Sequence, residues 1–105
     1  MAGCVVLTTV AAAADAEALA RSIVAARLAA CVQVVGPIRS IYRWHGEVCA
    51  EQEWRCEAKT TTERVDALVE HIAANHPYEL PEIVTLPIVA GSRPYLDWLA
   101  TETTG

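Results

Sequence analysis

The sequence predicts a small α/β domain of the α+β class, with strands and helices in the order β-α-β-β-α-β and a terminal helix. Three observations predict it. Short runs of apolar and β-branched residues recur along the chain, and such runs favour strands. Longer segments between them repeat apolar residues at helical spacing. The chain has 105 residues, the usual length of one domain, so residues 1–105 are expected to form a single domain.

The first two elements follow directly from these patterns. Cys4–Val10 is a compact apolar run, which predicts a buried strand. Ala11–Ala30 follows with Leu19 and Ile23 at helical spacing, so an amphipathic helix is expected there. Asp15 is its expected N-cap, because a short carboxylate can accept a hydrogen bond from a free backbone N–H.

A long hairpin is expected next. Cys31–Val35 resumes the strand pattern, and Gly36-Pro37 interrupts it, which predicts a bulge or bend on an edge strand. Ile38–Trp44 then alternates in polarity. His45-Gly46 is a turn signal because Gly adopts positive φ at no steric cost and His tolerates it. Glu47–Thr60 runs back with period two, so the two runs form a hairpin.

The second half of the chain also alternates between helical and strand patterns. Thr60–Glu63 fits a capping box, and the helix behind it must end near Asn75 because of the proline that follows. Glu82–Ile88 predicts a fourth strand, and a short last helix begins after Gly91-Ser92. Thr101–Gly105 is expected to be a frayed tail. This element order is that of a ferredoxin-like fold with an antiparallel sheet.

The composition points to self-association. Hydrophobic residues make up 53% of the chain, at the upper end of ordinary usage. In the predicted fold the helices cover one face of the sheet and leave the other open. Further copies of the same chain are the simplest cover for an open face and for an overhanging hairpin edge.

Charge and hydropathy exclude several classes of partner. Eight basic residues stand against thirteen acidic ones, for a formal net charge of −5, whereas a nucleic-acid binder needs a basic stripe. No apolar run approaches the roughly 20 residues that a transmembrane helix needs, and the start of the chain lacks a signal-peptide pattern. We therefore expect a soluble cytoplasmic protein without nucleic-acid or membrane partners.

Motifs for catalysis are absent from the sequence. It contains no Gly-rich phosphate loop, no H-E-x-x-H motif and no marked nucleophile–base pair, so no enzymatic activity is expected. No two cysteines have the C-x-x-C spacing, and the expectation is four free thiols that pack as small apolar side chains. They are Cys4, Cys31, Cys49 and Cys56.

Several short motifs then coincide in order and spacing. They are LAACV at 28–32, SIYRWHG at 40–46, HPYELPEI at 76–83, LPI at 86–88 and YLDWL at 95–99. Together they resemble the CutA divalent-cation-tolerance family over nearly the whole chain. The resemblance implies a homotrimer of ferredoxin-like subunits related in architecture to the PII signalling proteins. It also implies a cytoplasmic role in tolerance of divalent metal ions, copper binding in some members, and no established catalytic activity.

The resemblance suggests one candidate metal ligand, His76. In members with a proposed copper site, a Cys on the first strand joins a His-His pair before the Pro-Tyr. Thr8 and Asn75 stand at two of those positions here, so His76 alone remains. Copper, or another divalent cation, is the candidate metal. A histidine that satisfies carbonyls at a helix C-terminus is the alternative interpretation.

A second candidate site is a cleft between subunits. Polar residues stand at matched strand ends beside the open face, and we expect them to hold a small anion or a metal complex. A structural ion pair of Lys59 with Glu82 is the alternative. The row Glu53–Lys59 alternates in charge, and it predicts either a salt-bridge ladder across subunits or a solvated face. The candidate cleft residues are Trp44, Lys59, Tyr78 and Glu82.

Two functions remain open at this point. The first is a trimeric protein of the response to divalent metal ions, with copper or a small ligand at inter-subunit clefts. The second is a trimeric protein-interaction or PII-like signalling scaffold without intrinsic metal binding. The sequence identifies no protein partner for either.

Overall fold

The computed structural model describes residues 2–104, and its element order is the predicted one. The sheet has the strand order β2-β3-β1-β4, and every neighbouring pair is antiparallel. This is a ferredoxin-like arrangement with an added C-terminal helix, as predicted. The elements are β1 (Gly3–Val10), α1 (Ala13–Ala25), β2 (Cys31–Trp44), β3 (Glu47–Thr61), the 3₁₀ turn η1 (Thr62–Arg64), α2 (Val65–Asn75), β4 (Val84–Pro87) and α3 (Arg93–Glu102).

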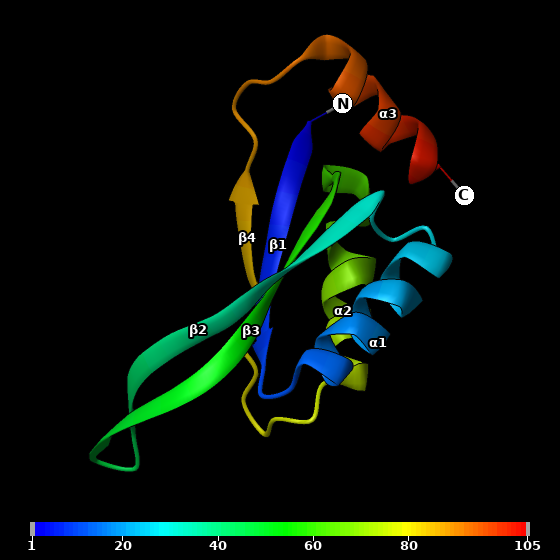
Figure 1. The fold of residues 1–105 in the computed structure, drawn as a ribbon. Coiled ribbons are helices and arrows are strands. Elements are labelled where there is room, and N and C mark those ends of the chain that lie inside the picture. Colours follow the sequence, from blue (N-terminus) through cyan, green and yellow to red (C-terminus); the bar gives the residue numbers. More distant parts are fainter. Residues whose placement is uncertain (1, 105) are drawn as a thin grey trace.

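The core lies between one face of the sheet and the two longer helices, α1 and α2 (Figure 1). Val6 of β1 and Ala58 of β3 point into it from neighbouring strands. Each fully buried Leu or Ile contributes roughly 1.5–3 kcal/mol through removal of its surface from water. The helical side chains in this cluster are Leu19, Ile23, Leu68 and Ile72.

The β2–β3 hairpin projects well beyond the rest of the domain (Figure 1). Its turn residues, His45 and Gly46, have φ values of 50° and 79°, a geometry that matches the twist of a tight hairpin. The pairing register shifts between Val35 and Ile38, around the cis peptide bond Gly36-Pro37. The predicted turn and the predicted edge-strand bulge are therefore both confirmed.

The first helix is shorter than predicted at both ends. It begins at Ala13 after the uncapped Ala12, and Asp15 lies within its first turn, so the predicted cap is wrong. It ends at Ala25 because Arg27 adopts a left-handed backbone with φ of 59°, which closes the helix with a hydrogen bond from Leu28 N–H to the Ile23 carbonyl.

The predicted capping box at Thr60–Glu63 is also wrong. Thr60 is fully buried, and its hydroxyl donates to the Leu28 carbonyl oxygen at 2.7 Å. A 3₁₀ turn without a side-chain cap precedes α2 instead. The fourth strand is shorter than the predicted Glu82–Ile88, because β4 pairs with β1 only along Cys4–Leu7.

The C-terminal segment is held in place rather than frayed. The Arg27 guanidinium donates to the carbonyl oxygens of Thr104 at 2.9 Å and Thr101 at 3.2 Å. Arg64 donates to the Thr103 carbonyl oxygen at 2.7 Å, and Thr103 is buried. The predicted frayed tail is therefore wrong for residues 101–104, and Gly105 lies outside the described residues.

Within residues 2–104, none of the helices combines the length and the apolar character needed to cross a lipid bilayer. All four cysteines are free, as predicted.

Candidate functional site

A cavity of about 820 Å³ lies between the outer part of the β2–β3 hairpin, residues 40–44 and 51–53, and the loop that joins α2 to β4. It brings together three of the four predicted cleft residues, Trp44, Tyr78 and Glu82. The complete lining is Thr9, Ala11, Ser40, Ile41, Tyr42, Trp44, Glu51, Gln52, Glu53, Tyr78, Glu79, Leu80, Pro81 and Glu82.

Local sequence explains how the two walls form. Ser40, Tyr42 and Trp44 alternate along β2, so they share one side of that strand. Pro77 forces the chain out of helix after Asn75, and the residues that follow run past the end of β1 before β4 begins. The loop therefore faces the hairpin across the cavity.

Tyr78 and Glu53 link these two walls. The Tyr78 hydroxyl donates to Oε2 of Glu53 at 2.8 Å. Glu53 is only 8% exposed. Burial, and then the hydrogen bond to the Glu53 carboxylate, raise the pKa of the Tyr78 hydroxyl well above its ordinary value. The phenol therefore stays neutral and serves as the donor.

Tyr42 on the opposite wall has a raised pKa as well. Desolvation raises the pKa of the Tyr42 hydroxyl, and the negative charges of Glu51 and Glu53 raise it further. Both phenols of the cavity therefore stay neutral and can donate hydrogen bonds.

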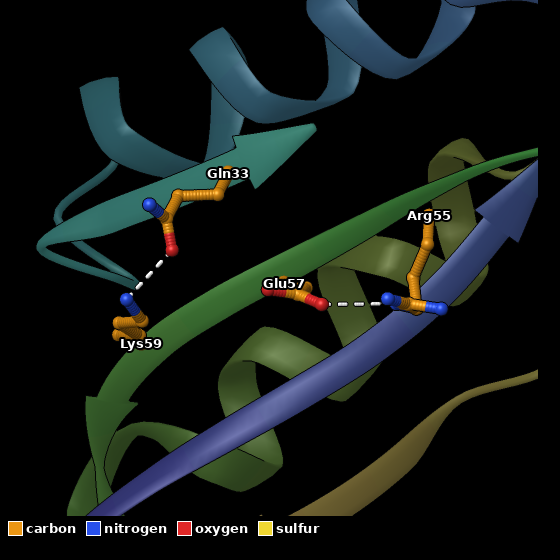
Figure 2. Close-up of polar contacts among 4 residues, drawn as sticks. All are labelled: Gln33, Arg55, Glu57 and Lys59. Atoms are coloured by element: carbon orange, nitrogen blue, oxygen red, sulfur yellow. Dashed lines mark hydrogen bonds and ion pairs between the residues drawn. The ribbon is translucent and has the colours of Figure 1, made fainter. Parts of the chain in front are cut away.

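Lys59, the fourth predicted cleft residue, lies outside the cavity. Its ammonium donates to Oε1 of Gln33 at 2.6 Å and lies 5.8 Å from the centroid of the Tyr95 ring (Figure 2 shows the Gln33 contact). The reason is register: Lys59 pairs with Val5 near the start of β1, whereas Glu82 lies toward the opposite end of that strand. The predicted Lys59–Glu82 pair is not formed within the subunit.

The charged row on β3 does not form a ladder within the subunit. Arg55 donates to Oε2 of its strand neighbour Glu57 at 2.9 Å, and both side chains are part-buried on the open face (Figure 2). Glu53, at the start of the same row, is instead bound to Tyr78. The open face thus carries local pairs along β3, beside the apolar residues of β1 and β4.

His76 uses both of its ring nitrogens on the protein itself. Nδ1 accepts from the Tyr78 backbone N–H at 3.1 Å, and Nε2 donates to the Thr9 carbonyl oxygen at 2.8 Å. These two partners define the neutral tautomer with the proton on Nε2. The imidazole therefore ties the end of α2 to β1 and has no free nitrogen for a metal.

The other two positions of the expected copper site do not fit a metal either. The Thr8 hydroxyl is buried and has no hydrogen-bond partner, and the Asn75 amide donates to the His71 carbonyl oxygen at 2.8 Å. Among residues 2–104, no three or more His, Cys, Asp or Glu side chains form a group that could hold one metal ion. The remaining ligand set at His76 does not suit copper, which requires several nitrogen or oxygen donors.

The two other histidines have structural surroundings. His71 is joined to Ser22 of α1 by a hydrogen bond of 2.9 Å, beside the apolar face of α2 as predicted. His45 packs edge-on against Trp44 at the hairpin tip, with ring centroids 4.9 Å apart.

Sequence reasoning missed most of the cavity lining, including one tyrosine and three of its four carboxylates. Glu53 was predicted only as part of a charged row, and its burial depends on the register shift at the bulge, which pairs it with Ile38. The alternation of Ser40, Tyr42 and Trp44 was a usable signal for Tyr42. The other missed carboxylates are Glu51 and Glu79.

The fold and this cavity define a class of protein: a small ferredoxin-like domain with a projecting hairpin and an acidic, aromatic cavity beside that hairpin. The model of the CutA1 divalent ion tolerance protein family matches residues 4–102. The chain therefore belongs to the CutA1 divalent ion tolerance family. The name of this family refers to tolerance of divalent ions and to no enzymatic reaction.

Two curated relatives show how far the similarity extends. The divalent-cation tolerance protein CutA of Thermus thermophilus is 50% identical over 99 residues, which are 94% of this chain and 96% of that one. The chloroplastic CutA of Arabidopsis thaliana is 46% identical over 85 residues, which are 81% of this chain but only 47% of that one. Because a relative is chloroplastic, family membership alone does not define a compartment.

The fold agrees with a solved structure of the family. The crystal structure of CutA1 from Oryza sativa superposes with a TM-score of 0.96 at 41% identity, over 99% of this chain and 95% of that chain. The predicted family and fold class are thus confirmed.

Proposed function

We propose that this chain acts as a homotrimer in the response to divalent metal ions, through ligand binding at the cavity rather than through catalysis. Membership of the divalent ion tolerance family carries the metal-related part of the proposal. The cavity, with Trp44, Tyr78 and Glu82 in its lining, supports a ligand role. The proposed compartment is the cytoplasm, and the four free cysteines agree with a reducing environment.

The open face of the sheet supports the trimer. The register of β1 with β4 aligns Val5 with Leu86 and Leu7 with Val84, so these four side chains form an apolar stripe on the face away from the helices. Val84 and Leu86 are 44% and 46% exposed in the single subunit. Apolar side chains in such a stripe gain stability when other copies cover them.

Native mass spectrometry at micromolar concentration tests the assembly, and the expected mass is three times that of the chain. A monomeric mass under these conditions would contradict the proposal. The metal-related part is tested separately. Cells that lack this chain and cells that overproduce it are grown at increasing copper concentrations, and their growth is compared. Equal tolerance in both strains would contradict that part.

The structure also supports a second candidate function, a trimeric interaction or signalling scaffold without intrinsic metal binding. The observation that favours it is the geometry of His76, whose two ring nitrogens are occupied by Thr9 and Tyr78. A copper titration followed by electron paramagnetic resonance separates the two functions. Nitrogen hyperfine structure that is lost in His76→Ala would support a copper site, and its absence in the native chain would support the scaffold.

A further inference from the structure

The projecting β2–β3 hairpin (Figure 1) has one face that the rest of the subunit leaves uncovered. Arg39, Ile41 and Arg43 alternate along β2, so they share the side of that strand opposite to Tyr42. Val48 pairs with Arg43 across the hairpin and is therefore a diagonal neighbour of Ile41 on the same side. Ile41 and Val48 are 70% and 68% exposed. We call these four residues, Arg39, Ile41, Arg43 and Val48, the basic face.

The two arginines of the basic face have no carboxylate partner within residues 2–104. The ion pairs of that range lie on α1 and farther along β3. Arg43 donates only to the carbonyl oxygen of Gly46, in its own turn, at 3.5 Å. Guanidinium groups form their strongest hydrogen bonds with carboxylates. Both arginines are exposed, so they are available to the carboxylates of another chain.

The cavity beside the same hairpin has the opposite charge. Its lining contains no Lys, Arg or His. Glu53 is bound by the Tyr78 hydroxyl within the subunit, whereas the three other carboxylates of the lining are exposed. They are Glu51 of β3 and Glu79 and Glu82 of the loop before β4. One chain therefore presents a basic face with exposed apolar residues and, on the other side of the hairpin, an acidic wall.

A second copy of the chain is the occupant that this charge pattern fits. Each copy carries both surfaces, so the acidic wall of one copy can receive the basic face of the next. Contacts between unlike patches are head-to-tail, and they close into a ring when the rotation between copies fits. Complementary charge also excludes other alignments, because like charges placed together are costly. The pattern thus agrees with a ring of three copies.

We propose that the basic face of one subunit docks on the cavity of the next, with Arg39 and Arg43 against Glu51 and Glu82 of the neighbouring copy. The contact covers the exposed apolar residues of the basic face and makes the cavity a cleft between two subunits. The inference rests on the proposed homotrimer, and it names the residues that join one copy to the next. It does not depend on the copper response.

The test is charge reversal, followed by native mass spectrometry of the full chain at micromolar concentration. The double variant Arg39→Glu/Arg43→Glu places like charges against the acidic wall and should convert the trimer to a monomer. Adding Glu51→Lys and Glu82→Lys to the same chain restores opposite charges, so the fourfold variant should be a trimer again. All four positions are exposed, and circular dichroism should show an unchanged fold in each variant.

The matched control is Arg21→Glu/Arg93→Glu, which makes the same change in net charge at exposed positions of α1 and α3. This control should stay trimeric. The inference is overturned if Arg39→Glu/Arg43→Glu stays trimeric, if the control dissociates equally, or if the fourfold variant stays monomeric. A native chain that is itself monomeric contradicts the proposed trimer and this contact together. A trimer that persists in the double variant removes only this contact and leaves the proposed trimer and metal response intact.

Discussion

At the scale of single residues, Thr8 is the one described side chain whose buried polar atom has no hydrogen-bond partner. It stands at 1% exposure on β1. Thr8→Val keeps the shape and removes the orphan hydroxyl, so it should raise the free energy of unfolding by about 1 kcal/mol. The measurement is the guanidinium midpoint at fixed protein concentration.

The matched control for Thr8 is Thr60→Val on the neighbouring strand. The Thr60 hydroxyl is equally buried but donates to the Leu28 carbonyl at 2.7 Å. Its removal leaves a buried acceptor unsatisfied and should lower the free energy of unfolding by about 1–3 kcal/mol. If both substitutions change stability in the same direction, the explanation from hydrogen bonding is wrong.

Tyr78 predicts a pH dependence at the same scale. Its folded-state pKa is raised above the ordinary value of 10.0, so the contribution of its neutral phenol is fully present below that pH. The contribution is lost as the pH rises above it, because the unfolded state then releases the proton more readily. The stability difference between the native chain and Tyr78→Phe should therefore shrink between pH values of roughly 9 and 11.

Chemical denaturation at several alkaline pH values measures this difference. Taking the difference between two chains that share every other titratable group cancels the contributions of those groups. A difference that stays constant over this range, or grows, would show that the Tyr78–Glu53 hydrogen bond does not control the ionisation of the phenol.

At the scale of elements, the bend in β2 depends on Gly36. A Cβ added there would lie 2.7 Å from Cγ of the Trp54 indole, closer than real Cβ contacts. Gly36→Ala must push the ring or the strand aside, and we expect it to lower the free energy of unfolding by about 1–3 kcal/mol. The control is Gly91→Ala, whose Cβ would meet Leu96 at an ordinary 3.5 Å, and a larger loss there would contradict the argument.

The element scale also shows what the sequence can predict. The hairpin turn at His45-Gly46, the bulge at Gly36-Pro37 and the end of α2 before Pro77 are local features, and the residues at those points determine them. The termination of α1 by the left-handed backbone at Arg27 was not predictable in the same way. Its left-handed backbone and its hydrogen bonds to the C-terminal segment depend on tertiary structure.

The candidate site likewise contains residues that the sequence could predict and residues that it could not. Trp44, Tyr78 and Glu82 were predicted because each lies in a recognisable motif at the end of an element. Lys59 lies away from the other three within one chain because strand order and register, rather than composition, decide which ends of strands meet, and its place in a cleft between subunits stays a prediction. Glu53 was missed because a carboxylate on an alternating strand is usually solvated, and here a loop distant in sequence covers it.

At the scale of the whole molecule, the apolar stripe of β1 and β4 predicts how the assembly can be broken. Leu86→Arg places a charge in the middle of the stripe and should convert the expected trimer to a monomer in native mass spectra. The control is Val24→Arg on α1, which is 43% exposed on the helical side of the sheet. If the control dissociates the assembly and Leu86→Arg does not, the helices rather than the open face form the contact.

Both ends of the described chain meet at η1. Thr62 N–H donates to the Ala2 carbonyl at 3.0 Å, and Arg64 donates to the Thr103 carbonyl at 2.7 Å. Figure 1 places both ends on the side of the domain away from the hairpin tip. A fluorescent protein or affinity tag fused at either end would therefore emerge away from the cavity, and fusions can be used to study ligand binding without obstructing it.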